Sequence, residues 1–161
     1  MSYSQLITFC PSIAEPDSEY PNGHGTGWRV WYALATKYGG EHSPALWIQE
    51  HLFRTWESVL QDFEKTVLLF TCDYAITRRG QFPQLVAALR KFVEVYPSTG
   101  VCHLCAIADR IEAFDETVEA VALYCSSNNE NLWTVYERNR WRPYDLSKDT
   151  EHWTQEEVSE M

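Results

Sequence analysis

Three glycines, Gly23, Gly25 and Gly27, alternate with other residues directly before an aromatic segment. Successive backbone N–H groups at the start of a helix can converge on a phosphate, so a loop of this kind could bind an anion. The spacing matches neither a P-loop nor a dinucleotide-binding fingerprint, and three acidic residues shortly upstream would repel an anion. We therefore expect these glycines to form a flexible entry into a helix.

Cys102, His103 and Cys105 bring two thiols and an imidazole within four residues. Two thiolates at this spacing can share a tetrahedral zinc ion, but a closed site needs four ligands, and the sequence offers no second pair at such spacing. Cys72 or Cys125 would complete the set only if the fold brought one of them close. We expect buried cysteines beside a partly exposed histidine, and we predict no metal and no cofactor.

Nucleophilic catalysis would need a nucleophile, a base and an orienting acid within reach of one another. The sequence contains neither G-x-S-x-G nor H-E-x-x-H. His24 in the glycine loop and Asp73 at the end of an expected strand are the residues to test for a catalytic role, because α/β folds place chemistry in loops and at strand ends. A small enzyme that uses the glycine loop with His24, or a Cys-His pair, on a small molecule is the alternative function.

The end of the chain interleaves tryptophan and tyrosine with carboxylates. Tyr and Trp are enriched in binding hot spots, and clustered carboxylates attract a basic partner. We predict a partner-binding surface made of nine residues: Glu137, Trp141, Tyr144, Asp145, Asp149, Glu151, Trp153, Glu156 and Glu157. In the alternative interpretation, the rings pack against the core and the carboxylates only face solvent.

The charge is concentrated in the same part of the chain. Residues 101–161 contain thirteen acidic and five basic residues, a net charge of −8 out of −10 for the whole chain. Such a field repels nucleic acid and anionic lipid, so we expect a basic protein partner, no nucleic acid and no membrane. We predict an acidic binding protein that neutralises a basic partner, as a toxin-immunity protein or phage-type inhibitor blocks a nuclease-like cleft. A homodimer with surplus aromatic residues in its interface is a further expectation.

The sequence has no apolar run of the ~18 residues that a spanning helix requires, and its first residues lack the features of a signal peptide. We therefore expect a cytoplasmic protein. The five cysteines are an odd number in a chain of 161 residues, which predicts free, reduced thiols.

The elements that would position these residues follow from periodicity. Residues 5–10 are a β-prone run that ends at a proline and predict a strand. Residues 11–27 combine proline, glycine and acidic residues without apolar periodicity and predict a long surface loop. Aromatic residues at helical spacing over 28–38 predict a helix, with Thr26 as its cap and a Gly-Gly pair as its stop.

The middle of the chain shows clear patterns. Residues 44–64 begin with a Ser-Pro pair and continue at helical spacing, which predicts a helix. Residues 66–76 are apolar, β-branched and aromatic, which predicts a buried strand. Residues 82–96 predict an amphipathic helix that ends at a proline. Residues 101–115 allow a helix or a strand, and we favour the helix.

Residues 117–125 predict a strand, residues 131–136 its hairpin neighbour, and residues 145–161 an acidic tail or short peripheral helix. Strands alternating with helices predict an α/β or α+β fold, a single domain over residues 1–161 with a central mixed sheet of about four strands covered by about four helices.

Overall fold

A computed structural model gives the fold of the chain. It describes residues 3–10, 13–21, 26–40, 59–71, 75–97, 103–126 and 142–143.

A mixed sheet with strand order β2-β1-β4-β3-β5 organises these residues. The strands are β1 (Tyr3–Cys10), β2 (Ile13–Pro21), β3 (Ala75–Arg78), β4 (Ala120–Ser126) and β5 (Arg142–Pro143). The pairings β2–β1, β1–β4 and β4–β3 are antiparallel, and β3–β5 is parallel. The predicted fold class, a mixed sheet with helices packed on it, is therefore confirmed.

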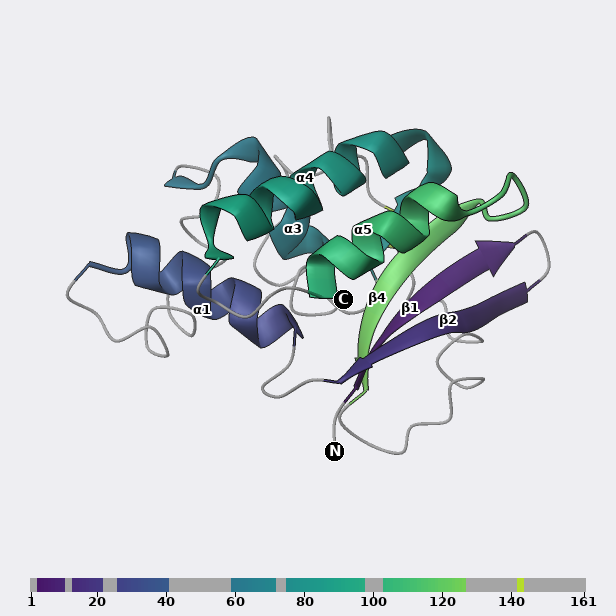
Figure 1. Cartoon of the computed structure of the whole chain (residues 1–161), viewed down its shortest axis with the longest axis horizontal. Coiled ribbons are helices and arrows are strands. Elements are labelled where there is room, and N and C mark those ends of the chain that lie inside the picture. The colour runs from purple at the N-terminus through teal and green to yellow at the C-terminus, as the bar shows by residue number, and fades with distance from the viewer. Residues whose placement is uncertain are drawn as a thin grey trace.

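Helices pack on one face of this sheet. They are α1 (Thr26–Tyr38), α3 (Asp62–Phe70), α4 (Phe82–Val95) and α5 (His103–Ala113), with the short 3-10 helix η1 (Arg79–Gln81) before α4. Figure 1 shows α4 and α5 side by side above the strands, with α5 next to β4 and β1. None of the helices within the described ranges combines the length and apolarity needed to cross a bilayer.

The strand register separates the two faces of the sheet. Leu6 of β1 lies opposite Leu123 of β4, and Thr8 lies opposite Val121. Leu6, Val121 and Leu123 belong to the hydrophobic core with buried residues of α1, α3, α4 and α5, so they mark the helix-covered face. Because side chains alternate along a strand, the residues between them point to the second face.

Two predicted helices are confirmed, although the first begins at Thr26, the residue predicted as its cap, and not at residue 28. The helix predicted over 28–38 is α1, and it ends where Gly39 donates its N–H to the Ala35 carbonyl oxygen at 2.8 Å. Gly40 follows with a φ of 59°, a conformation that glycine adopts without steric cost. The helix predicted over 82–96 is α4, whose apolar stripe is buried.

The surface loop predicted over 11–27 is wrong for most of its length, because Ile13–Pro21 forms β2 and α1 already begins at Thr26. Within the described part of the sheet, β2 is an edge strand that pairs with β1 alone. An edge strand tolerates prolines and exposed charges, and these residues hide the alternation that would have revealed it.

The buried strand predicted over 66–76 is also wrong, because Asp62–Phe70 forms α3 and only the last two residues of the range belong to β3. Nearly every residue of α3 is buried, so its sequence reads as a continuous apolar run, which periodicity does not distinguish from a buried strand. The predicted helix over 44–64 is interrupted before α3, since Gln61 has extended backbone; its residues 44–58 lie outside the described ranges.

The ambiguous segment 101–115 contains the helix α5, as favoured, and the strand predicted over 117–125 is β4. In the described sheet, β4 pairs with β1 on one side and β3 on the other. The hairpin strand predicted over 131–136 and the acidic segment 145–161 lie outside the described residues.

Candidate functional site

The predicted partner-binding residues all fall outside the part of the chain that the structure describes: Glu137, Trp141, Tyr144, Asp145, Asp149, Glu151, Trp153, Glu156 and Glu157. The catalytic candidates His24 and Asp73 and the possible ligand Cys102 lie outside it as well. These assignments stay predictions, and the groups described below are those the structure places.

His103 and Cys105 lie in the first turn of α5, and both are half-buried. The imidazole of His103 packs against the ring of Tyr20 on β2, with ring centroids 5.9 Å apart. Cys105 and Cys10 are free thiols. Within the described ranges, no three His, Cys, Asp or Glu side chains gather closely enough to hold a metal ion.

The carboxylate of Glu64 is the centre of a buried polar cluster. Glu64 lies on α3, is fully buried, and accepts hydrogen bonds from Tyr38 Oη at 2.5 Å and from Tyr96 Oη. The backbone N–H of Gln61 donates to the same carboxylate at 2.9 Å, which completes a capping box at the start of α3. Lys37 Nζ lies 3.7 Å from the Glu64 carboxylate and forms an ion pair with it.

This cluster ties together α1, α3 and the end of α4, because Lys37 and Tyr38 of α1 and Tyr96 after α4 all reach the carboxylate on α3. Burial, together with the hydrogen bonds to Glu64, raises the pKa of both Tyr38 and Tyr96. Burial opposes the charge of Lys37, but Tyr38 and Glu64 outweigh it and raise the lysine pKa. Both phenols therefore stay neutral donors at physiological pH.

Two arginines pair with carboxylates around α5. Arg110 on α5 binds Asp17 of β2 in a bidentate ion pair, and Arg90 on α4 binds Asp109 and Glu112 at 2.8 and 2.9 Å. These contacts dock α5 onto the edge of the sheet and onto α4. Asp109 and Glu112, which contribute to the negative charge of residues 101–161, are therefore each paired with a cation.

Three carboxylates remain exposed where α5 connects to β4. We call Asp115, Glu116 and Glu119 the acidic corner; in the described residues none of them forms a salt bridge. Asp115 accepts hydrogen bonds from the Thr117 hydroxyl and N–H, and these bonds lower the pKa of its carboxyl group. Arg79 lies nearby but donates to backbone carbonyls, those of Val118 and Asp115.

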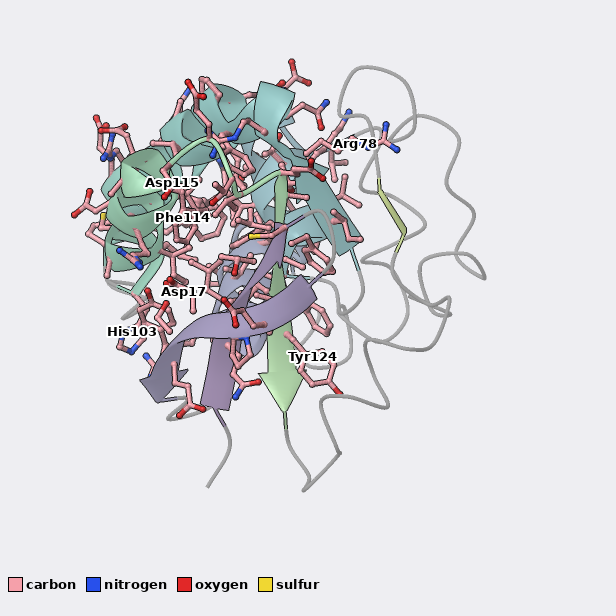
Figure 2. All side chains as sticks on the ribbon, turned by 90° about the vertical axis from the view of Figure 1, so that its right-hand side faces the viewer. Asp17, Arg78, His103, Phe114, Asp115 and Tyr124 are labelled. Atoms are coloured by element: carbon pink, nitrogen blue, oxygen red, sulfur yellow. The ribbon has the colours of Figure 1, made fainter. Side chains whose placement is uncertain are left out.

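A cavity of about 430 Å³ opens beside the acidic corner. Phe9, Ile76, Arg78, Arg79, Gly80, Glu119 and Ala120 line this cavity, which we call the notch. Phe9 lies opposite Ala120 and Ala120 lies opposite Arg78, so the register forms one row across three strands. Figure 2 shows Arg78 and Tyr124 on the side of the sheet away from Asp17, His103 and Asp115.

The sequence analysis missed both the notch and the Glu64 cluster. No local sequence pattern shows that Arg78 and Arg79 lie beside Phe9. For Glu64 a signal existed: the Gln61-x-x-Glu64 spacing fits a capping box, which starts a new helix just before the strand predicted from residue 66.

Comparison with known proteins returns no family model, no curated protein and no solved structure that matches this chain.

Proposed function

We propose that the protein is a cytoplasmic binding protein that neutralises a basic protein partner, as a toxin-immunity protein or phage-type inhibitor does. The observation that carries this proposal is the acidic corner: three exposed carboxylates close together in the chain, without a basic partner side chain among the described residues. One of them, Glu119, also lines the notch, so a partner bound at the corner can reach the apolar side chains of that cavity.

The geometry around the corner supports a preformed binding surface. Arg79 donates Nε to the Val118 carbonyl oxygen at 2.6 Å and also bonds the Asp115 carbonyl oxygen, so it fixes the backbone of the connection. The N–H of Glu119 donates to the Phe9 carbonyl oxygen at 2.8 Å, which anchors the corner to β1. A rigid surface loses little conformational entropy when a partner binds.

Charge supports a basic partner over an acidic one. The hydrogen bonds from Thr117 keep Asp115 ionised, because they favour its carboxylate form. A net charge of −10 on the chain draws cationic proteins toward it and raises their association rate at low salt. The nine residues predicted between positions 137 and 157 include six further carboxylates.

The test begins with the basic proteins encoded next to this chain's gene. Each is produced alone and together with this chain, and complex formation and loss of the partner's activity are measured at low and at physiological salt. We expect one of them to form a complex whose affinity falls as salt rises.

The variant Asp115→Asn/Glu116→Gln/Glu119→Gln should weaken that complex mainly by slowing association. The matched control, Asp109→Asn/Glu112→Gln, also removes negative charge from the same region, but from carboxylates already paired with Arg90. A complex that is insensitive to salt, or that loses as much affinity in the control, would contradict the proposal.

A further inference from the structure

The notch is a gap in a cross-strand row of side chains. Phe9, Ala120 and Arg78 stand next to one another on β1, β4 and β3, all on the second face of the sheet. Ala120 in the middle is the smallest of the three, so its methyl group forms a floor between the phenyl ring and the guanidinium. Ile76, two residues before Arg78, lines the same face.

The width of this gap suits one flat ring. Neighbouring strands lie about 4.8 Å apart, which places Phe9 and Arg78 on backbones about 10 Å apart. A ring stacked between the two side chains would have its centroid about 4.5–6 Å from the phenyl centroid and about 4.5–6 Å from the guanidinium, and these two distances together match the separation of the backbones. The volume of about 430 Å³ also exceeds what one tryptophan or tyrosine side chain needs.

Arg78 is free to take part in such a contact. Its side chain is exposed and, within the described residues, makes no hydrogen bond, ion pair or ring contact. Arg79, by contrast, is held by backbone carbonyls and by the ring of Phe82, 5.2 Å away. At the rim, Glu119 offers a carboxylate that can accept a hydrogen bond from an indole N–H or a phenol O–H.

The charge of the chain decides between the two flat groups that proteins commonly bind, a nucleobase and an aromatic side chain. A nucleobase brings phosphate into the field of a chain with net charge −10, where Glu119 repels it and the two arginines of the notch attract it only locally. An aromatic side chain brings no negative charge and presents the donor that Glu119 can satisfy. Tyr and Trp are also the residues that most often anchor one protein in a pocket of another.

We propose that the notch receives a tryptophan or tyrosine side chain of the partner protein, stacked between Phe9 and Arg78 with its N–H or O–H donated to Glu119. The inference rests on the proposed function, because it names the anchor by which the basic partner is held. The acidic corner steers the partner, and the notch retains it.

The notch is tested on the full chain with N-acetyl-L-tryptophanamide, by following backbone amide chemical shifts in NMR. We expect saturable shifts grouped at Phe9, Gly80 and Ala120. Arg78→Ala should weaken binding about two- to fivefold, the range of an exposed cation–π contact. Arg78→Lys should restore only part of the affinity, because it keeps the charge and loses the planar group.

Two further variants complete the design. Ala120→Leu fills the floor and should abolish binding, and Gly80→Leu narrows the rim at a position where an added Cβ meets nothing within 4 Å. Arg90→Ala is the matched control, since it removes a guanidinium from the helix-covered side. Chemical shift changes that are absent or scattered over the chain would overturn the inference, as would an equal loss of probe affinity in Arg90→Ala. Tighter binding of AMP than of the amide probe at the same amides would also overturn it, because the notch would then bind nucleotides.

The partner complex separates the two proposals. Arg78→Ala and Ala120→Leu should speed dissociation without changing the salt dependence. Asp115→Asn/Glu116→Gln, which leaves Glu119 of the notch unchanged, should instead slow association and flatten that dependence. A salt-sensitive complex that is unaffected by both notch variants would refute the notch alone. If the amide probe binds at the notch but none of the basic proteins tested forms a complex with the chain, the proposed function alone is refuted.

Discussion

Asp17 of β2 and Arg110 of α5 form a bidentate ion pair across 93 positions of sequence, with Nη2–Oδ1 at 2.6 Å and Nε–Oδ2 at 2.8 Å. The register of β1 and β2 passes from the pair Leu6–Ser18 to the pair Ile7–Pro16, so Asp17 is the extra residue of a β-bulge. A bulge redirects the side chain of its extra residue. Here it turns a carboxylate of an edge strand toward the helix layer, as Figure 2 shows.

This pair should make stability depend on pH in the acid range. The hydrogen bond from Arg110 lowers the pKa of Asp17 below the ordinary aspartate value of 3.8, although burial opposes it. A carboxyl group with a lowered pKa in the folded state contributes stability above its unfolded pKa and loses it as pH falls through the folded value. Asp17→Asn should therefore be less stable than the parent at pH 6, and the difference should vanish in strong acid. Urea unfolding across pH tests this, with Glu15→Gln on the same strand as control.

The buried carboxylate of Glu64 should contribute far more to the free energy of unfolding than a carboxylate on the surface does. Glu64→Ala leaves the hydroxyls of Tyr38 and Tyr96 without their acceptor, so we expect the free energy of unfolding to fall by about 3 kcal/mol. Glu64→Gln keeps an acceptor oxygen and should lose less. Chemical denaturation followed by circular dichroism measures both, and equal stability of all three proteins would contradict a stabilising role for the cluster.

The same cluster predicts a loss of stability in alkali. Tyr38 and Tyr96 have pKa values raised above the ordinary tyrosine value of 10.0, so each contributes stability that is complete below pH 10 and is lost as pH rises toward the folded values. Tyrosinate absorbance should show these two phenols titrating late and together with unfolding. In Tyr38→Phe/Tyr96→Phe the alkaline decline should be shallower, while Tyr32→Phe, which changes an exposed phenol, should leave it unchanged.

Arg79 should control the order of the acidic corner. Its guanidinium binds the carbonyl oxygens of Val118 and Asp115, two acceptors that a planar fork reaches together. Arg79→Ala should speed hydrogen exchange at the amides of residues 115–119, and Arg79→Lys should restore little of the protection. The paired control is Arg78→Ala, whose guanidinium makes no such contact; equal loss of protection in both would argue against this role.

Two glycines provide a matched test of backbone conformation. Gly40 has a φ of 59°, whereas Gly80 has no positive φ and an added Cβ there meets nothing within 4 Å. Gly40→Ala should lower the free energy of unfolding by about 1 kcal/mol, because a side chain disfavours this region. Gly80→Ala should change stability little. Thermal and urea unfolding measure the stability of both variants. An equal loss of stability in the two would show that the positive φ of Gly40 does not require glycine.

The sequence alone determined the elements whose pattern is local. The aromatic stripe of α1 and the amphipathic stripe of α4 repeat at helical spacing and are bounded by glycine or proline, so each helix follows from a dozen neighbouring residues. The strands β1 and β4 were also predicted from local sequence, because each contains a short run of β-prone residues. The mixed helix-and-sheet class then followed from their order along the chain.

Only the tertiary structure decided what depends on contacts between distant residues. The helix α3 and the strand β2 were both assigned wrongly, one because burial on all sides removes periodicity, the other because an edge position permits prolines and charges. Phe9, Arg78 and Ala120 are far apart in the chain and meet only through the register of three strands. Because register is set by pairing and core packing rather than by local sequence, neither the notch nor the Asp17–Arg110 pair could be found before the fold was known.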